Sequence, residues 1–203
     1  MKSLNNNILF TGGSGYLASG LIQKIKINNT VTHYSGDVRT LHEINTSPDI
    51  ICHFASPSDN LEFKDTYKTS TTIIEGTINM VNIAKKYGAK LVFASTMGVY
   101  TSRYDNIYTT CKSAMEHYIK SVYNNYIILR IPRVYSKCRK KGLMRQIKEG
   151  TIPEKDMSNN IYYITLEDFV KQTIPVLDCT GITHEYEITQ NKSIGEIKRW
   201  LEK

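Results

Sequence analysis

The chain has 203 residues, of which 40% are hydrophobic and 22% charged, and 26 basic against 19 acidic residues give a formal net charge of +7. This composition excludes a wholly disordered chain, and the length suits one globular domain with a buried core. No apolar stretch reaches the roughly 20 residues of a membrane span, and the first residues do not resemble a secretory signal, so we expect a cytoplasmic protein with no membrane partner.

The cysteines and the basic residues exclude two further classes. The four cysteines include no CxxC pair, so we expect neither a disulfide framework nor a bound metal. Much of the basic excess lies between residues 137 and 148, without a nucleic-acid recognition motif, so we expect no nucleic-acid partner.

Apolar strands alternate with amphipathic helices along the first two thirds of the chain. The expected strands are residues 7–11, 31–34, 49–55, 90–95 and 126–131. Three helices are expected: one directly after the glycine-rich turn that ends at residue 15, and two more over residues 72–87 and 108–123. Strands that are apolar throughout and alternate with helices predict a parallel sheet covered on both faces, an α/β fold.

The composition changes near Tyr135, where the basic stretch begins. We therefore divide the chain into a main domain, residues 1–135, and a small C-terminal portion, residues 136–203. The second part is too short to be confidently independent. Its expected elements are strands at 161–165 and 185–189 and helices at 166–176 and 193–203.

The first strand runs into the turn Gly12-Gly13-Ser14-Gly15 and directly on into a helix. Gly12 permits the tight turn, Gly15 lets the backbone approach a pyrophosphate, and the small Ala18 allows the helix to pack on the strand. This is the fingerprint of a Rossmann-type, doubly wound sheet that binds a dinucleotide, although the same turn also occurs without a ligand. The expected cofactor contacts here are Gly12, Ser14, Gly15, Tyr16 and Leu17.

The cofactor is expected to be NAD, with NADP left open. Asp37 lies roughly 20 positions after the glycine turn, where an acidic residue binds the ribose 2′-hydroxyl, and Val38 follows it. Arg39, close by, could instead accept the 2′-phosphate of NADP.

Three residues form a proton-transfer group. Tyr108 and Lys112 are one helical turn apart and share a face. A phenol near pKa 10 is a poor base at neutral pH, and an ammonium one turn away would stabilise its anion. Thr96 follows a strand, at the edge of the sheet where α/β proteins bind ligands, and could hold the substrate oxygen.

Five segments in order resemble extended short-chain dehydrogenases/reductases of the NAD-dependent nucleotide-sugar epimerase/dehydratase group. They are TGGSGYLA at Thr11, HFAS at His53, FASTMGVY at Phe93, YTTCK at Tyr108 and LRIPRVYS at Leu129. The resemblance covers most of the chain and implies an enzyme that couples proton transfer to hydride transfer.

The resemblance also implies roles for single residues. Thr96 takes the place of the catalytic Ser/Thr, Tyr108 that of the general acid/base, and Lys112 that of its partner. His53 is interpreted as a packed, hydrogen-bonded residue and not a catalyst. The further implied cofactor contacts are Phe54, Ala55, Ser56, Ser95, Pro132 and Val134, with Arg133 and Thr96 on the substrate.

Three departures from the family pattern qualify this interpretation. Residues 136–203, which the resemblance makes the substrate-binding portion, are truncated relative to the family. The connection between residues 38 and 49 is too short for the family's third strand, which we expect to be missing or merged. An arginine near Ile161 that grips the substrate diphosphate is absent, so Arg133 or the basic stretch would replace it, unless that stretch is only a solvated loop. That stretch contains Lys137, Arg139, Lys140, Lys141, Arg145 and Lys148.

The residues after Thr96 bear on the reaction. Met97 and Gly98 stand where 4,6-dehydratases carry an acidic pair, which disfavours dehydration. C4 epimerisation and keto-sugar reduction of a nucleotide-linked sugar both remain compatible with Thr96, Tyr108 and Lys112. The alternative is a non-catalytic NAD(P)-binding subunit or regulator.

The resemblance implies a homodimer built on two helices. Residues 72–87 and 108–123 correspond to the pair that forms a four-helix interface in this family. Tyr118, Ile119 and Val122 are expected in or near that interface.

Overall fold

The computed structural model describes residues 5–100 and 106–202 of the chain. Its main sheet has six strands in the order β2-β1-β3-β4-β5-β8, and every neighbouring pair is parallel. The strands are β1 (Asn7–Thr11), β2 (Thr30–Tyr34), β3 (Ile50–His53), β4 (Lys90–Thr96), β5 (Tyr126–Ile131) and β8 (Ile182–Glu185). The predicted doubly wound α/β fold is confirmed.

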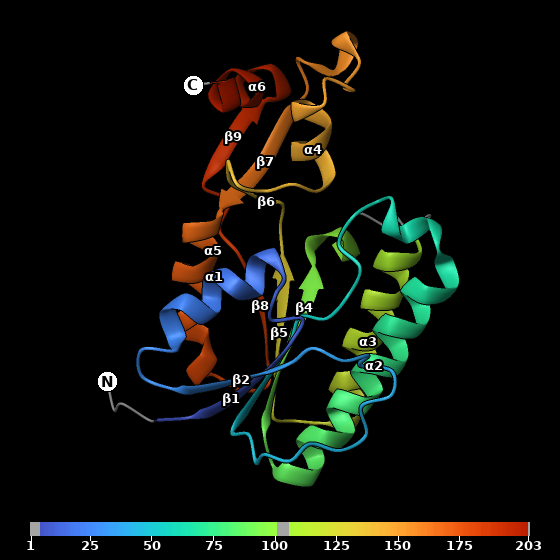
Figure 1. Ribbon diagram of the computed structural model, residues 1–203, viewed down its shortest axis with the longest axis vertical. Helices are drawn as coiled ribbons and strands as arrows, with labels where there is room; N and C mark the ends of the chain where they lie inside the picture. Colours follow the sequence, from blue (N-terminus) through green and yellow to red (C-terminus); the bar gives the residue numbers. More distant parts are fainter. Residues whose placement is uncertain (1–4, 101–105, 203) are drawn as a thin grey trace.

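Helices cover both faces of this sheet. Figure 1 shows the sheet nearly edge-on, with α1 (Tyr16–Ile25) and α5 (Leu166–Thr173) on one side and α2 (Thr66–Tyr87) and α3 (Ile107–Val122) on the other. Each side has its own hydrophobic core. Ile119 of α3 has no exposed surface and lies inside the second core, and the prediction that it lies in or near a subunit interface stays a prediction.

The ends of α2 show what apolar periodicity captures and what it misses. Gly88 ends the helix with φ of 66°, the left-handed conformation expected of a glycine cap. The helix begins at Thr66, six residues before the predicted start at Thr72. Asp65 caps it by accepting a hydrogen bond from the Lys68 N–H at 2.9 Å, and its first turn is exposed and therefore carries no apolar pattern.

The family's third strand is missing, as predicted. Residues 35–49 contain no helix or strand, so β2 forms the edge of the sheet. Leu41 from this connection is 5% exposed and packs into the second core.

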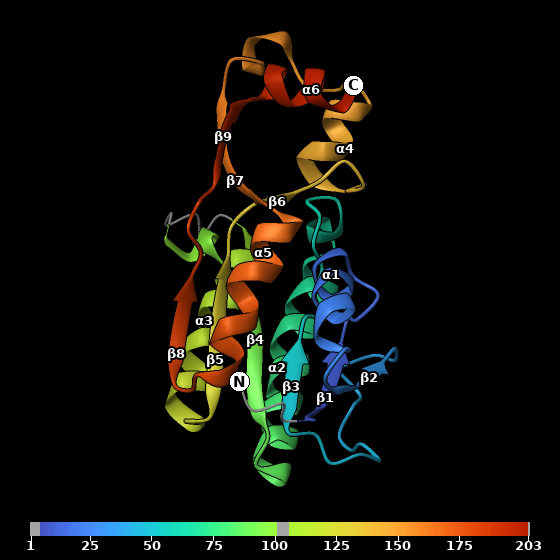
Figure 2. The ribbon, with the colours of Figure 1, turned by 90° about the vertical axis from the view of Figure 1, so that its left-hand side faces the viewer.

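A small lobe lies beyond the carboxyl ends of β4 and β5 (Figure 2). Its sheet has the order β6-β7-β9, and two helices pack on it around a third core that includes Tyr135, Met144 and Ile197. The elements are β6 (Val134–Tyr135), β7 (Asn160–Thr165), β9 (Gln190–Ser193), α4 (Gly142–Lys148) and α6 (Ile194–Glu202).

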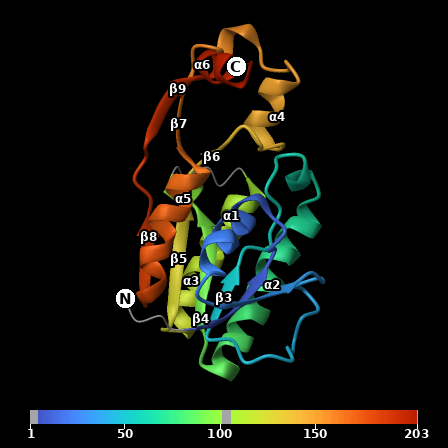
Figure 3. The same ribbon diagram turned by 60° about the vertical axis from the view of Figure 1, so that its left-hand side comes forward.

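The predicted boundary at residue 135 does not separate two units in space. After β7 the chain returns to the main sheet, where α5 packs beside α1 and β8 pairs with β5 (Figure 3). The strand predicted at 185–189 is wrong, because β8 ends at Glu185 and the next strand, β9, begins at Gln190. The helix predicted at 166–176 ends at Thr173 and continues as the 3-10 helix Ile174–Asp178, with Pro175 in its first turn.

Within residues 5–100 and 106–202, no helix combines the length and apolar character needed to cross a bilayer.

His53 joins three elements of the main core. Its Nδ1 lies 2.7 Å from Thr11 Oγ1 on β1, and its Nε2 lies 3.2 Å from Thr77 Oγ1 on α2. Burial, together with the charge of Lys112, lowers the pKa of His53 to about 3, so the ring is neutral at physiological pH. The interpretation of His53 as a packed, hydrogen-bonded residue is confirmed.

The low pKa of His53 predicts a specific loss of stability in acid. An unfolded chain protonates this histidine below about pH 6.5, so its contribution is complete above that pH and is lost as the pH falls toward 3. We expect His53→Gln to lower the free energy of unfolding at pH 7 by about 1–3 kcal/mol. The variant should lose less further stability than the wild type between pH 6.5 and 4. Urea unfolding at several pH values measures both effects, and parallel pH curves would contradict the assignment.

Candidate active site

The glycine turn between β1 and α1 has the shape of a phosphate site. Gly12 has φ of +70°, and a Cβ built on it would lie 2.7 Å from the backbone nitrogen of Ala55. Gly15 donates its N–H to the Gly12 carbonyl at 2.9 Å and precedes α1 without any side-chain cap. Ser14 and Gly15 are exposed, so the start of α1 is open to an anion. The turn therefore fits the pyrophosphate of a dinucleotide.

The segment after β3 borders this turn. Ala55 touches Gly12 through its backbone, and the ring of Phe54 packs in the first core against Phe10 and Phe169. Ser56 is half-buried, and its hydroxyl donates to the Pro57 carbonyl at 2.9 Å. Ala55 and Ser56 thus lie beside the open start of α1, whereas most of the Phe54 ring is used in packing.

Asp37 and Arg39 pair with each other at the end of β2. The Arg39 guanidinium donates from Nε to both Asp37 oxygens, at 3.0 and 2.9 Å, and Arg39 Nη1 reaches Thr71 Oγ1 at 3.4 Å. The hydrogen bonds from Arg39 lower the pKa of Asp37 to about 2. Val38 is 4% exposed and its side chain packs against Gly76 of α2 in the core. The cofactor contact predicted for Val38 stays a prediction.

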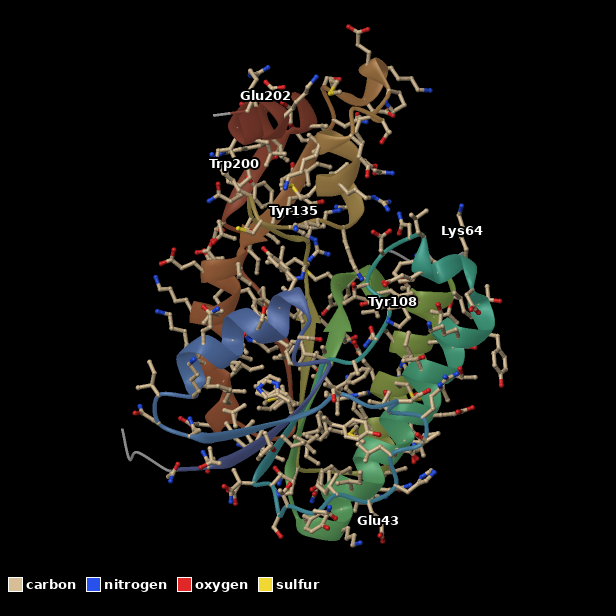
Figure 4. All side chains as sticks on the ribbon, in the orientation of Figure 1. Glu43, Lys64, Tyr108, Tyr135, Trp200 and Glu202 are labelled. Carbon is tan, nitrogen blue, oxygen red and sulfur yellow. The ribbon has the colours of Figure 1, made fainter. Side chains whose placement is uncertain are left out.

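Tyr108 lies in the first turn of α3, where Asn106 caps the helix by accepting the Tyr108 N–H at 2.9 Å. Its ring stacks on Phe63, with centroids 4.7 Å apart and planes 14° from parallel. Burial raises the pKa of Tyr108 to about 12, although a hydrogen bond with Ser56 and the charge of Arg139 act in the opposite direction. The phenol is therefore protonated at neutral pH. Figure 4 shows Tyr108 at the level between the main sheet and the small lobe.

Lys112 is 1% exposed and lies one turn along α3 from Tyr108. Its Nζ donates to the Ala94 carbonyl at 2.7 Å, 5.7 Å from the centroid of the Tyr108 ring and 4.6 Å from that of Phe93. Burial lowers the pKa of Lys112 to about 7, against the raising effects of Cys111 and Glu116. A small change in its surroundings would therefore change its charge at neutral pH.

Thr96 ends β4 beside the first turn of α3. Its Oγ1 accepts the Gly98 N–H at 3.1 Å, which leaves the hydroxyl proton available to a substrate oxygen. A Cβ built on Gly98 would lie 3.1 Å from Thr109 Oγ1 and 3.4 Å from Thr96 Oγ1. A side chain at position 98 would therefore be tight against Thr109 Oγ1, and the expectation that dehydration is disfavoured rests on the lack of a carboxylate at Met97 and Gly98.

The Ser95 hydroxyl is engaged inside the protein, and the cofactor contact predicted for this residue stays a prediction. Ser95 is 2% exposed and donates its hydroxyl to Glu116 Oε1 at 2.5 Å. Glu116 Oε2 also accepts a hydrogen bond from Arg130 Nη2 at 2.7 Å. The Arg130 guanidinium carbon lies 4.4 Å from the centroid of the Tyr100 ring. This buried ion pair joins β4, α3 and β5 behind the proton-transfer group. Glu116 lies one helical turn after Lys112, a spacing from which it could have been found.

The segment after β5 crosses from the main sheet to the small lobe. Pro132 is half-buried and Arg133 exposed, and the Arg133 carbonyl accepts the Ile164 N–H at 3.0 Å. Val134 is 4% exposed and lies in the first core, and the cofactor contact predicted for this residue stays a prediction.

The basic stretch is largely tied to the protein itself. Lys141 Nζ lies 2.7 Å from Glu62, Arg145 Nη2 lies 3.6 Å from Asp59, and Lys148 donates to two backbone carbonyls. The Arg139 guanidinium lies 4.9 Å from the centroid of Tyr16, next to the glycine turn. Among the described residues, no three His, Cys, Asp or Glu side chains group closely enough to hold a metal ion.

The sequence matches the RmlD substrate-binding domain family over residues 6–155. UDP-glucuronic acid decarboxylase 6 of Arabidopsis thaliana is 32% identical over 121 residues, which cover 47% of this chain and 35% of that protein. UDP-glucuronic acid decarboxylase 1 of Danio rerio is 30% identical over 116 residues, 46% of this chain and 28% of that protein. The chain thus spans about a third of the length of the curated relatives it matches.

Solved structures share the fold over nearly the whole chain. A dTDP-4-dehydrorhamnose reductase from Bacillus anthracis, in complex with NADP, has a TM-score of 0.81 at 19% identity, covering 99% of this chain and 81% of that one. A UDP-glucose 4-epimerase from Thermotoga maritima with UDP-glucose has a TM-score of 0.82 at 17% identity, covering 97% and 81%. Because the family match spans most of the chain and the fold agrees over nearly all of it, the chain belongs to the RmlD substrate-binding domain family, within the extended short-chain dehydrogenase/reductase group.

Proposed function

We propose that the protein is an NAD(P)-dependent oxidoreductase or epimerase acting on a nucleotide-linked sugar. The observation that carries this proposal is the placement of Tyr108 and Lys112 on one face of α3, with Thr96 beside the first turn of that helix. Relatives whose names include UDP- or dTDP-linked sugars support the substrate class.

Tyr108 would transfer the proton. Its phenol is protonated at neutral pH, which suits donation to the oxygen of a carbonyl as that oxygen gains negative charge. The Thr96 hydroxyl would hold the same oxygen, and the Lys112 ammonium would stabilise the phenolate left behind. Bound reduced nicotinamide supplies the hydride for the carbonyl carbon.

The cofactor would lie across the carboxyl edge of the sheet, with its pyrophosphate at the start of α1. The backbone of Gly12, Ser14 and Gly15 would hold the phosphates, because Gly15 precedes α1 without a side-chain cap. Asp37 and Arg39 would meet the adenosine ribose at the end of β2.

Keto-sugar reduction is the reaction we favour. Reduction needs one proton donation in one substrate pose, which a phenol held in the protonated state supplies directly. C4 epimerisation uses the same residues but also requires the sugar to turn within the site between two hydride steps. 4,6-Dehydration lacks an acidic side chain at Met97 or Gly98.

The alternative is an NAD(P)-binding subunit without turnover. Such a protein would retain the glycine turn but would not need Tyr108. The two functions therefore differ in what happens when the phenol oxygen is removed.

Tyr108→Phe separates enzyme from binding subunit. The variant keeps the ring that stacks on Phe63 and loses only the proton donor, so turnover should fall by about 10²–10⁴-fold while NADH or NADPH binds as before. Oxidation of reduced cofactor with a 4-keto nucleotide sugar measures turnover, and calorimetry measures binding. Tyr67→Phe, 75% exposed on α2, is the control. Unchanged turnover would contradict the catalytic role.

The same assays separate the two reactions. A reductase consumes one reduced cofactor for each keto-sugar, whereas an epimerase interconverts UDP-glucose and its C4 epimer without net consumption. Interconversion without consumption would replace reduction as the proposed reaction.

Asp37 and Arg39 predict the choice of cofactor. As long as Asp37 engages Arg39, its carboxylate repels a 2′-phosphate and favours NADH. We expect Asp37→Ala to raise the affinity for NADPH relative to NADH by at least about tenfold, since it frees Arg39 for a charge-assisted hydrogen bond. Titration calorimetry of the wild type and of Asp37→Ala, each with NADH and with NADPH, tests this. An unchanged ratio would show that neither side chain reaches the ribose.

A homodimer through α2 and α3 is a further part of the proposal. Tyr118 and Val122 are only partly buried on α3, so they can still contribute to an interface. We expect light scattering at micromolar concentration to give twice the 23.2 kDa chain mass. Tyr118→Glu should return the protein to a monomer, because a carboxylate is costly in an apolar interface. A wild-type mass of one chain would refute the dimer.

A further inference from the structure

The segment between β3 and α2 carries a ring onto the catalytic face. Residues 58–64 lie a few residues after β3 and include the 3-10 helix Glu62–Lys64. This helix holds the Phe63 ring nearly parallel to the Tyr108 ring, with the ring centroids 4.7 Å apart. Asp59 begins this turn and accepts the Phe63 N–H on its carbonyl at 3.2 Å. The position of Phe63 is therefore linked directly to that of Asp59.

Asp59 is in turn attached to the small lobe. Its side chain is 4% exposed, and Oδ2 accepts the N–H of Gly142, the first residue of α4, at 2.9 Å. Arg145 of the same helix lies 3.6 Å from Oδ1. Hydrogen bonds from Leu61 and Gly142, with the charge of Arg145, hold the pKa of Asp59 below its usual range although burial raises it.

A second carboxylate reinforces this attachment. Glu62 Oε1 lies 2.7 Å from Lys141 Nζ, and Glu62 Oε2 accepts the Ser58 N–H at 2.7 Å. Both acidic residues come from the segment at the main sheet, and both basic residues come from the start of α4. Lys141 and Arg145 of the basic stretch therefore hold the two parts of the protein together.

We propose that Phe63 is a positioning residue for Tyr108, and that the docking of α4 on Asp59 and Glu62 sets its position. The small lobe then controls the orientation of the proton donor through one short segment. The proposal extends the proposed function, because it takes Tyr108 as the group that transfers the proton. Figure 4 shows Lys64 in this segment, Tyr108 below it and Tyr135 in the small lobe.

The stack of Phe63 on Tyr108 has a signature that needs no substrate. Stacked rings shift each other's proton resonances upfield, and Tyr108 is identified among the 14 tyrosines by its absence from the spectrum of Tyr108→Phe. In protein with labelled tyrosine rings at neutral pH, Phe63→Leu should abolish the upfield shift and Phe63→Tyr should retain it. Asp59→Asn should reduce it, because the variant loses the charge that pairs with Arg145.

Kinetics then tests the positioning role. We expect Phe63→Leu to lower kcat by about 10–100-fold with little change in KM, because a displaced donor slows the proton transfer and not the binding. Phe63→Tyr, which keeps an aromatic ring at this position, should leave kcat at the wild-type value. Glu43→Gln, which removes an exposed ion pair with Lys86 far from this segment, is the matched control and should leave both the resonance and kcat unchanged.

Several outcomes would overturn the proposal. An unchanged Tyr108 resonance in Phe63→Leu would show that the stack is not present in solution. An unchanged resonance in Asp59→Asn would show that α4 does not set it, and a shifted resonance with wild-type kcat would leave Phe63 as packing only. If the wild type turns over no nucleotide sugar, the proposed function fails, while the resonance still decides whether the lobe acts on Tyr108.

Discussion

The contact between the backbone of Gly12 and that of Ala55 is the constraint on which the active face depends. A Cβ on Gly12 would come within 2.7 Å of Ala55, so only glycine allows the β1–α1 turn to lie against the end of β3. That contact places the open start of α1 next to the segment that continues through Ser56 to Phe63. One close backbone contact therefore connects the phosphate site at the start of α1 with the segment whose Phe63 stacks on Tyr108.

Burial acts in opposite directions on the two groups that would move and stabilise the proton. It raises the pKa of Tyr108 to about 12 and lowers that of Lys112 to about 7, since each change favours the neutral form in a poorly solvated site. The fold supports this arrangement with the buried pair of Glu116 and Arg130, which ties α3 to β5 directly behind it. Removing one partner of such a pair would leave an uncompensated charge and disturb the helix that carries both functional groups.

The basic stretch has a different role from the one its charge suggests. The net charge of +7 favours an anion site in the basic stretch. The lack of an arginine near Ile161 to grip the substrate diphosphate favours the same site. In the folded chain, Lys141 and Arg145 meet Glu62 and Asp59 instead, while Arg139 lies on Tyr16 beside the glycine turn. Within this stretch, Lys141 and Arg145 therefore attach the small lobe to the main domain, whereas Arg139 lies near the phosphate site.

Local patterns in the sequence determined the parallel sheet, the glycine turn, the missing third strand and the one-turn spacing of Tyr108 and Lys112. These features depend on periodicity and on backbone conformations that single residues allow, so they are visible without a structure. Only the tertiary structure decided that Ser95, Val38 and Val134 face inward, because burial depends on which element packs against each residue. It also decided that β8 rejoins the main sheet and that Phe63, from an irregular segment with no periodic signal, stacks on Tyr108. Contacts between residues far apart in the chain have no local signature, and for this protein they set the environment of the proton donor.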